Sequence, residues 1–276
     1  MRAIYRIAAA TFHEAWRRRF LNAILIFAVL IIGSSWSLAY LQPGAELKLL
    51  LDIGLGSIRF FGMLIAIFLG VRLISDELEK RTIHTILTKP VTRAQFLLGK
   101  YFGSLATVFS NLALMGIAFF AVFALKAPGF MHPKAESTQG SGPGFSTEFI
   151  YANIGKAIGL TFVEAMVVTA LAVMSSTLFS WIMAAVFSFF VYFVGQVADF
   201  FKTLAGRGEG AGRLPKAIFG VLYAVLPHFE VFDMREAIIK GIYVGWDTLG
   251  MHVGLGLLYG ALLLGIAFLA FMHREV

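Results

Sequence analysis

The chain has 276 residues, of which 59% are hydrophobic and 14% are charged, whereas soluble domains are about 45–50% apolar and about 25% charged. This composition excludes an ordinary soluble domain and predicts a polytopic membrane protein, and the absence of cysteine excludes a disulfide framework, a thiolate nucleophile and a cysteine-ligated zinc site. The net charge of +7 is interpreted as a topology signal and as contact with lipid headgroups, so no nucleic acid is expected as a partner.

Residues 1–19 are predicted to form an amphipathic helix that lies in the membrane interface. Their apolar side chains recur at helical spacing, while most of the charged ones fall on other faces. The candidate interfacial residues are Phe12, Trp16, Arg17 and Arg18. A signal peptide cleaved near Ser37-Leu38-Ala39 is the alternative, but the leader and the apolar run are longer than usual for such a peptide.

Six apolar segments are candidates for membrane spans, since a spanning helix needs roughly 20 mostly apolar residues. They are Phe20–Leu41, Ser57–Ile74, Phe102–Leu125, Ile158–Phe179, Trp181–Phe200 and Leu249–Met272. The predicted fold class is therefore an all-α polytopic membrane protein with six transmembrane helices in a single domain over residues 1–276.

Basic residues predict the topology. Arg17, Arg18 and Arg19 precede the first span, which favours a cytoplasmic N-terminus, and six spans return the C-terminus to the same side. The glycine- and proline-rich residues 126–156 then form an external loop. Four basic residues after the fifth span disagree with the charge rule: Lys202, Arg207, Arg213 and Lys216.

Residues 201–248 are predicted to form an external hairpin region before the last span. Their apolar stretch Ala217–Leu226 covers only about 15 Å as a helix, about half the hydrocarbon thickness, so it is too short to cross. A re-entrant or interfacial hairpin fits this length better than a seventh span.

A polar loop, residues 76–100, joins the second and third spans on the cytoplasmic side. Helical spacing of its apolar residues predicts that the second span continues as a helix through Thr88, and Pro90 ends it. Thr92 and Gln95 have capping-box spacing, which predicts a new helix leading into the third span. The mixture of apolar and charged side chains suits docking to another protein, and the alternative is a solvated connector.

This loop closely resembles the cytoplasmic loop of ABC-2-type transporter permeases. The similar stretch is "ISDELEKRTIHTILTKPVTRAQFLLGKYFG", residues 74–103, and "LPHFEVFD", residues 226–233, looks like the external Leu-Pro segment of many members. Arg81 stands where many members have glycine. The residues that the resemblance assigns to docking and coupling are Glu77, Glu79, Arg81, Thr82, Thr88, Pro90, Val91, Thr92, Arg93 and Phe96.

The resemblance implies a multi-pass permease subunit of the bacterial inner membrane that couples ATP hydrolysis to export. A separate cytoplasmic ABC ATPase subunit would hold ATP and Mg²⁺, because this chain has no phosphate-loop motif and is expected to be non-catalytic, without a cofactor of its own. A second permease, as a homodimer, and additional envelope proteins are further expected partners beside the lipid bilayer.

Two other functions stay open at this point. One is a permease-like scaffold that uses ATPase strokes to assemble or regulate an envelope machine, as in metalloenzyme maturation or surface motility. The other is an intramembrane enzyme or an ATPase-independent channel. The six histidines are scattered and predict no metal site.

Polar residues inside spans are costly and often functional, which makes them candidates for a transport pathway. They are Arg59, Glu164, Gln196 and Asp199. Arg59 and Glu164 are candidates for an ion pair. The alternatives are that Arg59 extends to the outer interface and that Asp199 faces water.

Overall fold

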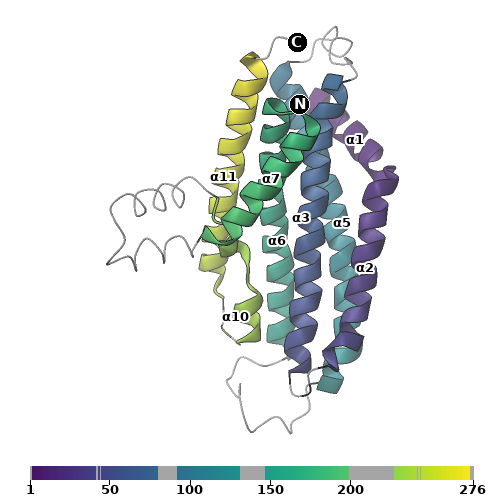
Figure 1. Ribbon diagram of the computed structural model, residues 1–276. Coiled ribbons are helices and arrows are strands. Elements are labelled where there is room, and N and C mark those ends of the chain that lie inside the picture. Colours follow the sequence, from purple (N-terminus) through teal and green to yellow (C-terminus); the bar gives the residue numbers. More distant parts are fainter. Residues whose placement is uncertain are drawn as a thin grey trace, which may run out of the picture.

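The computed structural model describes residues 2–41, 43, 45–79, 92–130, 147–198, 227–240, 242 and 244–273, with backbone alone for 73–79, 127–130, 147–149 and 273. This part of the chain is helical and contains no β-strand (Figure 1). Its long helices are α1 (Arg2–Trp16), α2 (Arg19–Ala39), α3 (Glu46–Glu79), α5 (Arg93–Phe130), α6 (Thr147–Leu178), α7 (Trp181–Gln196) and α11 (Trp246–His273). Two short elements, η2 (Phe229–Phe232) and α10 (Arg235–Ile239), precede α11.

Five helical segments in the described residues are long and apolar enough to cross a membrane. They are Arg19–Ala39, Glu46–Arg72, Arg93–Lys126, Ile150–Leu178 and Trp246–Met272. These segments confirm an all-helical, multi-pass membrane protein. The predicted fifth span corresponds to α7, a shorter apolar helix of 16 residues, so the six-span count stays a prediction, as does the re-entrant hairpin.

Helix α3 begins at Glu46, well before the start predicted at Ser57. The first turns carry charged residues that lower their hydropathy, but Leu47, Leu50 and Leu51 lie at helical spacing. Leu50 and Leu51 are fully or almost fully buried, so this stretch belongs to the core of the bundle. Arg59 consequently lies midway along the apolar segment Glu46–Arg72.

Helices α3 and α6 form the centre of the bundle, where most of their apolar surface is buried. They approach each other closely at Gly70, where an added Cβ atom would lie 2.6 Å from the Cβ atom of Ala172. Helices α2 and α11 lie at the periphery and bury few of their apolar side chains fully (Figure 1). Such exposed apolar helix faces are what a hydrocarbon environment requires.

Helix α1 packs against α5 at two glycines spaced four residues apart. An added Cβ atom at Gly99 would lie 2.8 Å from the Cβ atom of Ile7, and one at Gly103 would lie 2.6 Å from the Cβ atom of Thr11. This spacing places both glycines on one helix face, where their small size permits close contact. Helix α1 and the C-terminal end of α11 lie at the same end of the bundle (Figure 1).

Candidate functional site

Arg59 and Glu164 form a buried ion pair at the centre of the bundle. Arg59 Nε donates to Glu164 Oε2 at 2.7 Å, and Arg59 Nη2 donates to Oε1 at 2.9 Å. The two residues are 8% and 2% exposed, so the pair is shielded on nearly all sides. A planar guanidinium matches a carboxylate in this two-bond geometry, which fixes both side chains. The alternative that Arg59 extends to the outer interface is therefore wrong.

Two polar residues of α7 complete the surroundings of Glu164. The Tyr192 hydroxyl donates to Glu164 Oε1 at 3.2 Å, and Gln196 Nε2 donates to the same oxygen at 2.9 Å. The Gln196 oxygen in turn accepts a hydrogen bond from Arg59 Nη2 at 3.2 Å. Three helices, α3, α6 and α7, thus meet at one hydrogen-bonded network.

The segment from Pro227 to Lys240, which contains η2 and α10, brings a fourth element to this network. Arg59 Nη2 donates to the carbonyl oxygen of Phe229 at 3.0 Å, and Arg59 Nη1 donates to the Asp233 carboxylate. We refer to this segment as the 227–240 segment. We refer to the whole set of polar groups as the polar cluster: Arg59, Glu164, Tyr192, Gln196, Asp233, Arg235 and the carbonyl group of Phe229.

Asp233 is shared between two arginines. Arg235 donates from Nε to both carboxylate oxygens, at 3.0 and 3.1 Å, and from its backbone nitrogen at 3.0 Å. Burial alone would raise the pKa of the Asp233 carboxyl, but the hydrogen bonds from Arg235 and the charge of Arg59 outweigh it and hold the pKa below its ordinary value. Asp233 is therefore an anion at neutral pH.

Two glycines permit the 227–240 segment to lie this close to the helices. An added Cβ atom at Gly195 would lie 2.5 Å from the carbonyl oxygen of Pro227 and 2.6 Å from the Phe229 ring. At Gly56 it would lie 3.0 Å from Arg235 Nη1. Gly195 lacks the space for a side chain because the Pro227 backbone fills it, whereas the neighbour of Gly56 is the end of the flexible Arg235 side chain, which can shift.

The polar cluster joins elements and shows no arrangement for covalent chemistry. Its two carboxylates already accept hydrogen bonds from arginines, so they are poor candidates for a general base or a metal ligand. In the described part of the chain, no three histidine, aspartate or glutamate side chains are grouped so as to hold a metal ion. The cluster is suited to fixing the relative positions of four elements until something moves one of them.

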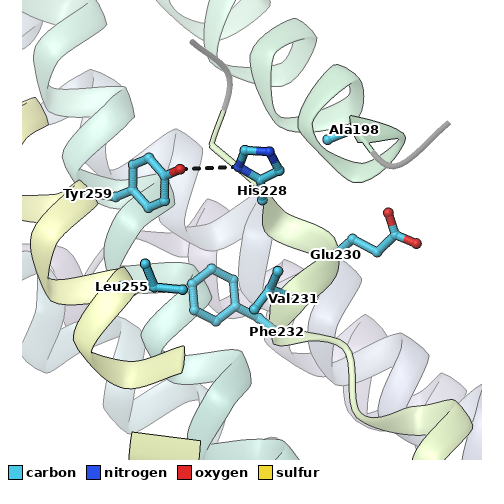
Figure 2. A pocket seen from close by; sticks show the side chains of 7 residues that line it. All are labelled: Ala198, His228, Glu230, Val231, Phe232, Leu255 and Tyr259. Carbon is cyan, nitrogen blue, oxygen red and sulfur yellow. Dashed lines mark hydrogen bonds between the residues drawn. The ribbon is translucent and has the colours of Figure 1, made fainter. Parts of the chain in front are cut away.

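A cavity of about 330 Å³ lies between η2, α11 and Ala198, which follows the end of α7 (Figure 2). His228 Nδ1 and the Tyr259 hydroxyl are 3.1 Å apart across it, which joins the 227–240 segment to α11. The other lining residues are Ala198, Glu230, Val231, Phe232 and Leu255.

The start of α5 confirms the predicted capping box. The backbone nitrogen of Thr92 donates to the side-chain oxygen of Gln95, and the backbone nitrogen of Gln95 donates to the Thr92 hydroxyl, both at 3.3 Å. Helix α5 begins at the next residue, Arg93, and continues without a break through the third predicted span. The capping box therefore ends the loop and starts the helix within one residue.

The docking residues predicted from the loop fall into four groups. Glu77 and Glu79 lie in the last turns of α3. Five others lie outside the described residues: Arg81, Thr82, Thr88, Pro90 and Val91. The pathway candidate Asp199 also lies outside them. Thr92 is exposed. Arg93 and Phe96 both contact the end of α11, and Phe96 is only 5% exposed, so this part of the predicted surface is engaged within the chain.

Of the predicted helix over residues 1–19, the structure forms α1 over Arg2–Trp16, and its place in the membrane interface stays a prediction. Helix α1 buries Thr11 and Ala15 against the bundle. Trp16 is exposed and stacks on Phe12 at 5.7 Å between ring centroids. Arg17 is exposed, and Arg18 donates to Glu14 at 2.8 Å.

Sequence reasoning missed Asp233, Arg235 and Tyr192. Asp233 ends the quoted stretch "LPHFEVFD", so a signal was present, but nothing in the sequence places that stretch against α3. Gln196 was predicted as a pathway candidate, and the structure brings it to the same network as Arg59 and Glu164.

Apolar helices of spanning length around a buried ion-pair cluster define a polytopic α-helical membrane protein. The chain belongs to the ABC-2 family of transporter proteins, because the family model described as "ABC-2 family transporter protein" matches residues 5–276. This match confirms the resemblance found in residues 74–103.

Two curated relatives carry a permease name. The chain is 35% identical over 130 residues to a "Probable ABC transporter permease protein NosY" of Pseudomonas aeruginosa, a match that covers 45% of this chain and 47% of that protein. It is 37% identical over 107 residues to a protein of the same name from Stutzerimonas stutzeri, covering 37% of this chain and 39% of that protein. In each case the aligned part is less than half of the relative's length.

Proposed function

We propose that this chain is the permease subunit of an ATP-driven exporter and that a separate cytoplasmic ATPase subunit binds the loop between α3 and α5. One observation supports this most. Helix α3 runs unbroken from the polar cluster to Glu79, and α5 begins at Arg93 directly after its capping box. A force on the short loop is then applied to two long helices without an intervening linker.

The mechanism follows from helix geometry. Arg59 and Glu79 lie on the same helix, about 30 Å apart along its axis at 1.5 Å per residue. When ATP closes the partner ATPase, the loop moves, and α3 tilts with it as a rigid element. The tilt displaces Arg59 relative to α6, α7 and the 227–240 segment, and the polar cluster rearranges.

The proposed contacts with the ATPase are Glu77, Glu79 and Arg81, with Pro90 and Val91 at the tip of the loop. ATP can change the permease only if such contacts differ between the open and closed states of the ATPase. The exposed apolar faces of α2, α7 and α11 are available for lipid and for a second copy of the chain, and we propose a homodimer in the inner membrane with both termini cytoplasmic.

Charge reversal at the loop tests this function. Glu79→Lys and Arg81→Glu should each lower the ATPase activity of the reconstituted complex while leaving membrane insertion unchanged. Lys48→Glu is the matched control, because Lys48 is an exposed charge at the opposite end of the same helix. Full partner binding and full activity in both loop variants would overturn the docking assignment.

A further inference from the structure

Arg93 makes its hydrogen bonds to a different helix from the one that contains it. Its Nη1 atom donates to the carbonyl oxygens of Phe271 and Met272, both at 3.2 Å. These residues lie in the last turn of α11, where carbonyl groups have no partner within their own helix. A cation is also favoured at this negative end of the helix dipole.

The position of Arg93 is unfavourable for α5 itself. It is the first residue of that helix, where the dipole disfavours a positive charge. The hydrogen bonds from Arg93 to α11 explain why a cation occupies the first position of α5. The Phe96 ring stacks on the Phe271 ring at 6.3 Å between centroids, and the Arg93 guanidinium lies 5.9 Å from the same ring. The first turn of α5 and the last turn of α11 are thus joined by polar and aromatic contacts together.

Farther along, α11 contacts the 227–240 segment. Tyr259 pairs with His228 (Figure 2), and an added Cβ atom at Gly256 would lie 3.4 Å from the Phe232 ring. Tyr259 and Met272 are about 20 Å apart along a helix that contains no proline. One continuous element therefore touches both the end of the cytoplasmic loop and the segment that carries Asp233.

The way the charges are paired in the polar cluster permits the 227–240 segment to separate from Arg59. Arg59 and Glu164 remain together as a neutral pair on the helices, and Asp233 and Arg235 remain together as a neutral pair on the segment. Separation breaks the contact between Arg59 and Asp233 but leaves neither side with a net charge. The large cost of an unpaired buried charge is thereby avoided.

We infer that α11 is a second mechanical connection, with Arg93 as the positioning residue that ties it to the ATPase-driven loop. Movement at the loop then displaces the 227–240 segment from Arg59 through α11, in addition to the tilt of α3. This inference rests on the proposed function. The inference differs from the proposed function in two ways. It assigns Arg93 to a contact within this chain, with α11, and it names the 227–240 segment as the part that responds.

Distance measurements between spin labels test the inference, and the lack of native cysteine makes the labelling specific. Labels are placed at the exposed residues Glu230 in η2 and Leu125 in α5, in a double-cysteine variant reconstituted with its ATPase. Trapping with ATP and vanadate should change the distance between them. Arg93→Ala should reduce the responding fraction about tenfold, because it removes charge-assisted hydrogen bonds, whereas Arg93→Lys should retain the response.

Arg72→Ala is the matched control, since the Arg72 guanidinium lies over the Trp181 ring of α7 at 5.5 Å, a contact that the inference does not use. It should leave the distance change intact. Tyr259→Phe removes only the hydroxyl that pairs with His228 and should also weaken the response, which gives a second variant if Arg93→Ala fails to fold.

Four results would overturn the inference. A full response in Arg93→Ala, or no ATP-dependent change in the labelled parent, would contradict it while leaving ATPase binding, and so the proposed function, intact. Loss of the ATPase from Arg93→Ala with retention by the control would make Arg93 a docking residue instead. If no ATPase binds even the parent chain, the proposed function fails and the inference fails with it.

Discussion

Arg59 of α3 and Glu164 of α6 form a two-bond ion pair midway along two apolar helices, with both side chains buried. Each charge makes the other tolerable, because an unpaired charge at such a depth is expensive. The pair also fixes the relative position of the two central helices and offers Arg59 as a donor to the 227–240 segment.

Removing one member of this pair should destabilise the protein strongly. Arg59→Met leaves the Glu164 carboxylate buried without its cation, which should cost about 3–5 kcal/mol. The double variant Arg59→Met/Glu164→Met should recover much of this loss, since neither charge remains. Thermal unfolding in mild detergent measures the difference.

Arg18→Met provides the control for that series. Arg18 pairs with Glu14 four residues away on an exposed face, and such a pair contributes only about 0.3–0.5 kcal/mol. Equal losses in Arg59→Met and Arg18→Met would contradict the stabilising role of the buried pair.

Asp233 should make the stability of the protein depend on acidic pH. Its pKa is held below the ordinary value of about 3.9 by Arg235 and Arg59, so the folded state favours the anion. The stabilisation is complete above the unfolded pKa and is lost as pH falls through the folded pKa. The stability difference between the parent chain and Asp233→Asn should thus be constant above about pH 5 and should shrink below about pH 4.

Thermal unfolding of both chains from pH 3 to pH 7 measures this difference. Asp247→Asn serves as a control for a carboxylate outside the polar cluster. A difference that disappears at neutral pH, or one that persists unchanged at the acidic limit, would show that the carboxylate of Asp233 is not the responsible group.

The contact between α1 and α5 should depend on Gly99 and Gly103. Valine at either position places side-chain atoms where α1 now lies, and such overpacking typically costs about 1–3 kcal/mol. Helix α1 should then separate from α5. A cysteine introduced at Thr11, which is now buried, should react faster with a water-soluble maleimide.

Gly155→Val is the matched control, because no atom lies within 4 Å of a Cβ atom added there. It should leave the reactivity at position 11 unchanged. Unchanged labelling in the Gly99 and Gly103 variants would mean that α1 is held by other contacts.

The capping box should contribute to the local stability of the loop end. Thr92→Ala removes the hydroxyl that accepts from Gln95, at a cost of about 1 kcal/mol, whereas Thr92→Ser keeps it. Amide hydrogen exchange in the first turn of α5 should be faster in the alanine variant and normal in the serine variant. Equal protection in both variants would show that the cap is dispensable.

Local rules predicted the features of this chain that depend on neighbouring residues. The spacing of Thr92 and Gln95 predicted a new helix after the loop, and α5 begins at Arg93, because a capping box depends only on two residues three positions apart in the sequence. Because a buried charge is costly, Arg59 and Glu164 were likewise predicted to be functional residues and candidates for an ion pair.

Features that depend on distant packing escaped prediction. The partner of Arg59 in the 227–240 segment is 174 residues away in the sequence, and the segment packs against α7 at Gly195, a contact that no local pattern predicts. The early start of α3 was also missed, because charged residues interrupt its first turns although the leucines between them are buried.

The most direct test of the central claim is to identify what binds the chain in its native membrane. The tagged protein is extracted in mild detergent, purified once, and analysed by quantitative mass spectrometry. The account predicts an ATPase with a phosphate-loop motif in stoichiometric amount, and further envelope proteins in the same peak would favour a larger machine over a simple exporter. Absence of any such ATPase under several mild conditions would contradict the account.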